Sequence, residues 1–170
     1  MIDWNRPAAG RNALAAALAA VLLLPASADA VVIRQPLRFF EGHTEMLSVV
    51  RVMMKRPYRS RTLGSGQILP DGSLALVQQI YDEGKPPTQR RWLVRQVAPG
   101  RYAGTMTEAV GPVSVRQVGG SYRFKFRMKG NLAIEQWVTP LPGGASARTD
   151  LTVRKMGLRV ATSTGTISRV

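Results

Sequence analysis

From residue 31 onward, turn residues divide the sequence into short runs, and no long run shows the apolar spacing of a helix. Pro70-Asp71-Gly72 ends one run, and the stretch 82–87, Asp-Glu-Gly-Lys-Pro-Pro, ends the next. Such residues favour tight turns because glycine tolerates positive φ, proline fixes φ, and aspartate bonds its own backbone. Regularly spaced short strands joined by tight turns predict an all-β fold, either a sandwich or a barrel.

The clearest predicted strand runs from Tyr122 to Lys129, where apolar and cationic residues alternate without interruption. Successive side chains of a strand point to opposite faces. Tyr122, Phe124, Phe126 and Met128 therefore share one face, which we expect to be buried. The basic residues form the opposite, outer face: Arg123, Lys125, Arg127 and Lys129.

Connections decide between the two all-β architectures. A Greek-key sandwich needs a long crossover, whereas every connection in this chain is short. The sequence therefore predicts one antiparallel up-and-down, lipocalin-like β-barrel of about 8–10 strands, whose interior is filled or holds one small ligand. The predicted strands are Leu37–Met54, Tyr58–Leu69, Ser73–Asp82, Gln89–Val97, Arg101–Glu108, Val113–Val118, Ser121–Lys129, Leu132–Thr139, Arg148–Lys155 and Leu158–Arg169.

The first 30 residues have the composition of a cleaved helical signal peptide. Arg6 and Arg11 precede a run without polar residues from Ala13 to Leu24, and small residues follow Pro25. That apolar run is shorter than the ~20 residues that a membrane-spanning helix needs. We expect cleavage after Ala28 or Ala30, which leaves residues 31–170 as a single periplasmic domain.

Charge and the absence of cysteine limit the partners of such a domain. The chain has 24 lysines and arginines, 10 acidic residues and a net charge of +14. Export removes nucleic acid as an ordinary partner, so anionic lipid headgroups, acidic glycans or an acidic protein remain. With no cysteine, the chain has neither a disulfide nor a lipid anchor through an N-terminal cysteine.

The succession of short motifs resembles the exported bacterial proteins of domain-of-unknown-function family 3833. The resemblance implies a lipocalin-like barrel and no established activity. Many members of that family look like lipoproteins, and the missing cysteine here implies a soluble periplasmic protein instead. The motifs that carry the resemblance are Phe39-Phe40-Glu41-Gly42, Asp71-Gly72-Ser73-Leu74, Tyr81-Asp82-Glu83-Gly84, Arg91-Trp92, Gly100-Arg101-Tyr102-Ala103-Gly104, Glu108-Ala109-Val110-Gly111 and Met156-Gly157-Leu158.

Large side chains predicted to face the barrel interior are the candidate ligand site. They either fill the barrel or surround an apolar pocket, because small barrels of this size do both. Arg91 could meet an acidic headgroup at the pocket mouth, or stack on an aromatic ring from outside. The candidate interior residues are Trp92, Val94, Tyr102, Met106, Tyr122, Phe124, Phe126, Ile134 and Trp137.

We find no catalytic constellation, cofactor motif or metal site in the sequence. His43 is the only histidine, and a zinc site there would need both Glu41 and Glu45 as further ligands. Gly64-Ser65-Gly66 lacks the full pattern of a nucleophile elbow. The sequence therefore predicts a non-enzymatic protein that binds an apolar or amphipathic small molecule, such as a fatty acid or lipid. The alternative is an interaction protein that contacts anionic membrane or cell-envelope components through the basic face of the 122–129 strand.

Overall fold

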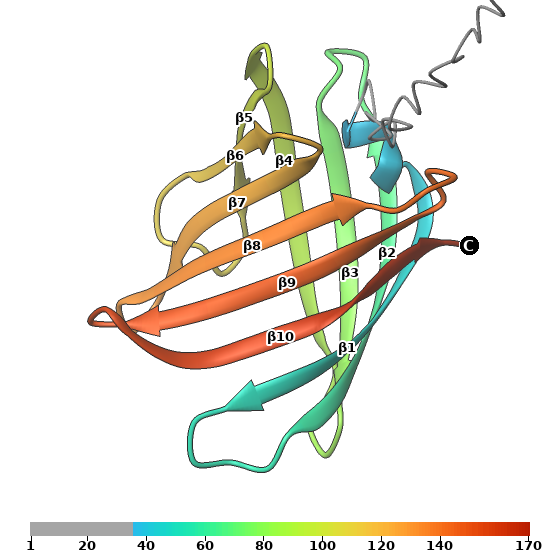
Figure 1. Ribbon diagram of the computed structural model, residues 1–170. Coiled ribbons are helices and arrows are strands. Elements are labelled where there is room, and N and C mark those ends of the chain that lie inside the picture. Colours follow the sequence, from blue (N-terminus) through green and yellow to red (C-terminus); the bar gives the residue numbers. More distant parts are fainter. Residues whose placement is uncertain (1–35) are drawn as a thin grey trace, which may run out of the picture.

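The computed structural model describes residues 36–170, which form a short 3₁₀ helix and a closed barrel of ten antiparallel strands (Figure 1). The predicted signal peptide, residues 1–30, lies outside the described residues. The elements are η1 (Pro36–Phe40), β1 (Gly42–Val52), β2 (Tyr58–Ile68), β3 (Leu74–Asp82), β4 (Thr88–Ala98), β5 (Arg101–Met106), β6 (Val113–Val118), β7 (Ser121–Met128), β8 (Leu132–Pro140), β9 (Ser146–Lys155) and β10 (Leu158–Arg169).

Each strand pairs with its neighbours along the chain, and β1 pairs with β10 to close the barrel. Met46 lies opposite Ile167 at this closure. The predicted all-β, up-and-down barrel is therefore confirmed. Closure pairs both edges of the sheet, and an exposed edge would otherwise be open to association with another chain.

The first predicted strand, Leu37–Met54, is wrong at its start. Residues Pro36–Phe40 form η1, and β1 begins only at Gly42. Gly42 has φ +84°, a value that favours glycine and that lets the chain turn from the helix into the strand. Phe39 is buried. In a strand, consecutive side chains point to opposite faces, so one of the two adjacent rings Phe39 and Phe40 would face solvent. The helix η1 instead lets both rings pack at the end of the barrel, which η1 plugs.

The plug η1 lies over one end of the barrel, and we refer to this end as the η1 end (Figure 1). Phe39 packs there against Val138, Ala147 and Ile167. A Cβ atom at position 66 would overlap the carbonyl oxygen of Phe40, so only glycine lets β2 approach the helix this closely. The main core cluster occupies the barrel interior below this plug.

No helix among residues 36–170 is long and apolar enough to cross a membrane.

Candidate functional site: the barrel interior

The barrel encloses a cavity of about 110 Å³ that is lined mainly by apolar side chains. This space is several times the volume that a single water molecule requires. Alternation along each strand selects the lining residues, so β3 contributes Leu74, Leu76, Gln78 and Ile80 from one face. Pro36, Leu37, Phe39 and Phe40 close the cavity from the η1 end.

Aromatic residues from β4, β5 and β7 form one wall of the cavity. The rings of Trp92 and Phe126 meet edge to face, with their centroids 5.6 Å apart. The indole N–H of Trp92 donates a hydrogen bond of 2.7 Å to Oε1 of Gln78. This bond satisfies the polar atom of a buried tryptophan and fixes the orientation of its ring. Tyr102 and Tyr122 are also buried in this wall.

Burial affects the two tyrosines chemically. Loss of solvent raises the pKa of the Tyr102 phenol, because a phenolate would be poorly hydrated there. Burial likewise raises the pKa of Tyr122, and the neighbouring charge of an ionised Tyr102 raises it further. Both phenols are therefore neutral at physiological pH and present polar hydroxyl groups without charge.

Strands β1, β2 and β9 contribute small hydroxyl side chains to the opposite part of the interior. Thr44, Thr62 and Thr149 are buried there. The amide of Gln136 donates a hydrogen bond of 2.8 Å to the hydroxyl of Thr149. A Cβ atom at position 64 would overlap the hydroxyl of Thr44, so glycine gives that side chain its space. The interior thus combines an aromatic wall with a wall of small polar groups.

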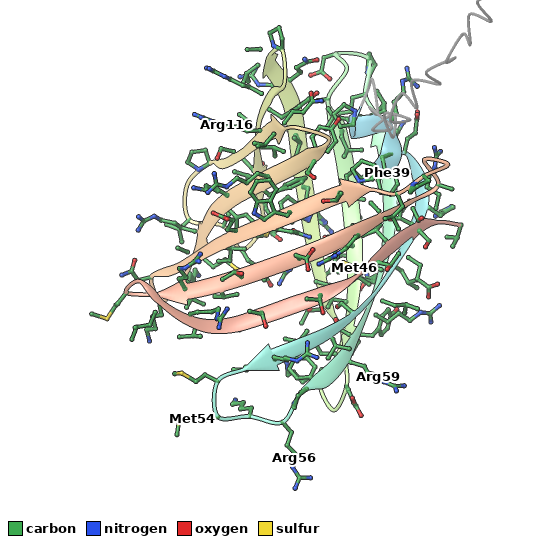
Figure 2. The ribbon with its side chains drawn as sticks, viewed as in Figure 1. Phe39, Met46, Met54, Arg56, Arg59 and Arg116 are labelled. Atoms are coloured by element: carbon green, nitrogen blue, oxygen red, sulfur yellow. The ribbon has the colours of Figure 1, made fainter. Side chains whose placement is uncertain are left out.

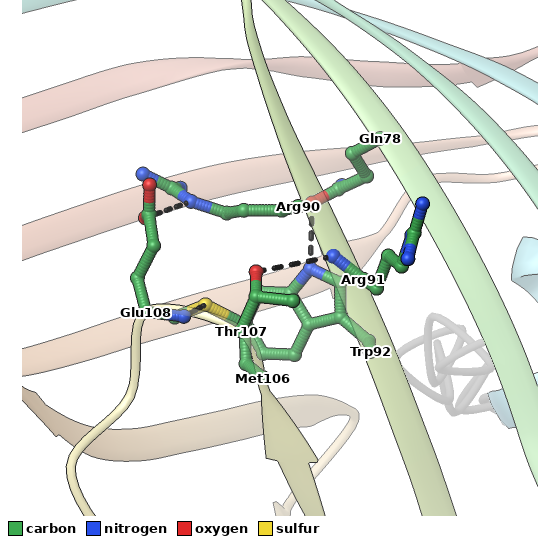
Figure 3. Close-up of polar contacts among 7 residues, drawn as sticks. All are labelled: Gln78, Arg90, Arg91, Trp92, Met106, Thr107 and Glu108. Carbon is green, nitrogen blue, oxygen red and sulfur yellow. Dashed lines mark hydrogen bonds and ion pairs between the residues drawn. The ribbon is translucent and has the colours of Figure 1, made fainter.

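One charged pair lies at the side of the cavity. Arg90 lines it, and its Nε lies 2.6 Å from a carboxylate oxygen of Glu108 (Figure 3). Because Gln78 and Arg90 are opposite each other across β3 and β4, the amide and the guanidinium share the inner face. Arg90 and Glu108 are each about one-third exposed, so they remain accessible to a polar ligand group.

Glu108 is placed by the loop between β5 and β6. The amide of Ala109 donates to the carbonyl of Met106 at 3.0 Å, and the amide of Val110 donates to the carbonyl of Arg127 at 2.8 Å. These bonds hold the loop across β7. The Glu108 amide also lies 3.3 Å from the Met106 sulfur (Figure 3).

The structure places most of the predicted interior residues around the cavity. Met106 and Ile134 are buried in the adjoining core and do not line the cavity itself. The predicted residues that do line it are Trp92, Val94, Tyr102, Tyr122, Phe124 and Phe126.

Two of the predicted ligand-site residues lie on the outer face, so their placement at the cavity is wrong. Trp137 is opposite Arg123 in the β7–β8 register and therefore shares its outward face. The guanidinium of Arg123 lies over the Trp137 ring, 5.4 Å from its centroid. Arg91 is exposed because it neighbours the inward-facing Trp92, and its backbone N–H faces the hydroxyl of Thr107 (Figure 3).

Sequence reasoning missed the polar residues of the interior. Gln78, Arg90 and Gln136 all line the cavity. Alternation from Trp92 could have identified Arg90, because residues two apart on a strand share a face. Gln78 follows Leu74 and Leu76 by the same rule.

The basic residues of β7 lie on the outer face, but an acidic neighbour partly neutralises them. Glu135 of β8 lies 2.8 Å from Arg123 and 3.5 Å from Lys125. The hydrogen bond from Arg123 lowers the pKa of Glu135, and a further bond from the Trp137 indole acts in the same direction. Arg127 contacts Asn131, and Lys129 is exposed beside the β7–β8 turn.

The side chains of Glu41, His43 and Glu45 do not converge on one site in the structure. Glu41 pairs with Arg38 and Glu45 pairs with Arg61, while His43 is exposed. Within residues 36–170 no three histidine or acidic side chains form a group that could hold a metal ion.

Comparisons with known proteins identify a fold and no family. No family model matches the chain, and no curated protein sequence matches it. Among solved structures, the barrel is similar to an S-type phycobiliprotein lyase from Guillardia theta, with a TM-score of 0.65 and 8% identity over 82% of this chain and 93% of that chain. It is also similar to the Rv2717c protein of M. tuberculosis, with a TM-score of 0.61 and 13% identity over 84% of this chain and 98% of that chain.

A third similar structure is a protein of unknown function from the DUF3598 family of Nostoc punctiforme, with a TM-score of 0.57 and 13% identity. The similarity covers 79% of this chain and 49% of that one. At these identities the likeness concerns the fold alone. The fold and the cavity together define this chain as a lipocalin-like β-barrel protein.

Proposed function

We propose that this protein is an exported, non-enzymatic binding protein whose barrel holds one apolar or amphipathic small molecule, such as a fatty acid or lipid. The observation that carries the proposal is the apolar cavity between the aromatic wall and the plug η1. At about 110 Å³ the cavity holds only part of an acyl chain, so a whole fatty acid enters only when η1 or lining side chains move aside. Ligand pockets are typically apolar, with a few polar groups that fix orientation. Gln78, Arg90 and Gln136 are such groups in this interior.

The polar groups of the cavity favour an amphipathic ligand over a hydrocarbon. Arg90 and Gln78 supply N–H donors on the inner face beside Trp92. A ligand with an oxygen-containing end would bond these groups while its apolar part packs on the rings of Trp92 and Phe126. A pure hydrocarbon would leave the same donors without a ligand partner, and this reduces affinity.

Support for a binding role over catalysis comes from the site, since fold alone decides neither. One similar barrel is named a lyase, and that activity belongs to that protein. Here the only histidine, His43, is exposed on β1. The charged pair at the cavity, Arg90 and Glu108, is an ion pair rather than a nucleophile held by a base.

The two barrel tryptophans provide a matched test. Trp92→Leu removes the ring that lines the cavity, whereas Trp137→Leu removes a ring on the outer face. The full chain is titrated with a fatty acid that carries an environment-sensitive fluorophore. We expect Trp92→Leu to weaken binding by about 10- to 150-fold, because one buried aromatic contact contributes about 1.5–3 kcal/mol.

Trp137→Leu should leave the dissociation constant unchanged, and circular dichroism should report the same strand content for both variants. Equal weakening by the two substitutions would contradict a site inside the barrel. Failure of the wild-type chain to bind the fatty acid or any lipid tested would contradict the proposed function itself.

A further inference from the structure

Two neighbouring hairpin turns lie at the end of the barrel opposite η1. They are the β1–β2 turn, residues 53–57, and the β9–β10 turn, residues 156–157. The amide of Met53 donates a hydrogen bond of 2.9 Å to the carbonyl of Val160, which joins the end of β1 to β10. Figure 2 shows Met54 and Arg56 at this end, far from Phe39. We call the two turns with their flanking residues, 51–59 and 154–160, the hairpin rim.

Large apolar side chains of the hairpin rim extend into solvent. Met54 is 97% exposed and Met156 is 82% exposed, and each stands at the tip of its turn. Met53 and Leu158 flank these tips and are also largely exposed. A single exposed apolar residue is ordinary on a protein surface, but a group of four on adjacent turns indicates a contact surface.

The backbone at both tips is unfavourable for methionine. Met54 has φ +62° and Met156 has φ +50°. Both values lie in the left-handed region, which residues other than glycine, asparagine and aspartate rarely adopt. Gly157 follows with φ +83°, as expected of a two-residue hairpin turn that favours Asn-Gly. A methionine in such a place breaks a local rule, and natural proteins break local rules mainly at functional sites.

The hairpin rim is basic and contains no acidic residue of its own; Glu83 of the neighbouring β3–β4 turn contacts it by accepting a hydrogen bond of 3.0 Å from the backbone N–H of Arg59. The sequence has no aspartate or glutamate from position 46 to 70, nor from 151 to 170. Among the described residues, the ion pairs involve none of the basic side chains of the rim. This distinguishes the rim from the β7 row, where Glu135 neutralises part of the charge. The rim's basic residues are Arg51, Lys55, Arg56, Arg59, Arg154, Lys155 and Arg159.

We propose that the hairpin rim docks on an anionic lipid bilayer, with the methionine and leucine side chains in the interface and the basic side chains on the headgroups. Apolar residues surrounded by lysine and arginine suit a bilayer, because the apolar groups enter the acyl boundary while the long basic side chains reach the phosphates. Methionine and arginine are also common at protein interfaces, but the core of such an interface is depleted of charged residues, whereas here seven basic residues surround four exposed apolar ones. The proposal does not depend on a ligand in the cavity.

The absence of cysteine allows a test by site-specific labelling of the full chain. Met54→Cys, Met156→Cys and Val118→Cys are each labelled with an environment-sensitive fluorophore. Val118 is the control, because it is 47% exposed and ends β6 at the η1 end. With vesicles of equal parts phosphatidylglycerol and phosphatidylcholine, emission from positions 54 and 156 should shift to shorter wavelength and be quenched by brominated acyl chains. Emission from position 118 should not change.

Charge reversal provides the second arm. Lys55→Glu with Arg56→Glu should weaken vesicle binding by at least about 25-fold, since each basic residue near an anionic surface contributes about fivefold. The control pair, Arg101→Glu with Arg116→Glu, makes the same change in net charge at the other end of the barrel, where Figure 2 shows Arg116. This pair should weaken vesicle binding far less. Equal effects of the two pairs, or a response at position 118 as large as that at position 54, would overturn the proposal. So would unchanged emission from all three labels.

Discussion

The plug η1 offers a quantitative test of how the barrel end is closed. Phe39→Ala removes a ring that is only 4% exposed and that packs on Val138, Ala147 and Ile167. The ring also meets Phe40 edge to face at 5.1 Å. Substitution of a buried phenylalanine by alanine costs about 3–5 kcal/mol of unfolding free energy. Because η1 lies at the barrel end, where solvent can fill the space, we expect a loss of about 3 kcal/mol.

This loss is measured by urea unfolding, followed by circular dichroism of the strands. The corresponding fall in the thermal midpoint is about 10 °C for a domain of this size. Arg38→Ala is the control from the same helix, because Arg38 is exposed and its contact with Glu41 lies at the surface. Such a surface pair contributes at most about 1 kcal/mol. If Phe39→Ala changes stability no more than Arg38→Ala, then η1 is not docked in solution and the closed end is refuted.

Three further predictions concern the strands and the titratable groups. Gly104→Ala should destabilise the barrel by about 1–3 kcal/mol in urea unfolding, because its Cβ would overlap the Leu93 carbonyl oxygen and lie 2.9 Å from the Val94 backbone. Tyr122 has a raised pKa in the folded state, so its contribution to stability is complete below about pH 10 and is lost as pH rises. Tyr122→Phe should therefore reduce the alkaline decline in the thermal midpoint. Glu135 has a pKa lowered from 4.5, so the stability that its ionised carboxylate contributes is complete above that pH and is lost as the pH falls further. Glu135→Gln should therefore reduce the fall of the thermal midpoint at acid pH.

Each of these outcomes has a contrary result. A Gly104→Ala barrel as stable as wild type would contradict the close approach of β4 and β5. An alkaline decline unchanged by Tyr122→Phe would place the phenol in solvent rather than in the cavity wall. An acid decline that is the same with Glu135→Gln would show that the contact with Arg123 does not stabilise the fold.

The strand order could be predicted from sequence because turn chemistry is local. Pro70-Asp71-Gly72 and the other turn residues mark the strand ends wherever the chain lies in the fold. Short connections then leave antiparallel neighbours as the only pairing, and closure follows from the need to pair the edges. Predicted strand bounds therefore differ from the observed ones by only a few residues at most positions, as at β5, which ends at Met106 rather than Glu108.

Which side chains of β8 face the barrel interior could not be predicted, because on this strand a polar residue faces inward and an aromatic residue faces outward. Gln136 is polar and faces inward, whereas Trp137 is aromatic and faces outward. Only the register with β7, which places Phe124 opposite Gln136, decides between the two faces. The sequence also did not predict the helix η1, for a related reason. Phe39 and Phe40 are consecutive apolar residues, and their helical path depends on the barrel end that they close.

The binding role is tested most directly by the mass of the folded protein as cells produce it. The protein is purified without detergent, and its native mass spectrum is recorded beside an organic extract of the same sample. We predict a stoichiometric apolar or amphipathic adduct that is retained by Trp137→Leu and depleted by Trp92→Leu. A bare protein mass that added fatty acids and lipids do not shift would contradict the account, because it would show a barrel that takes up no such ligand.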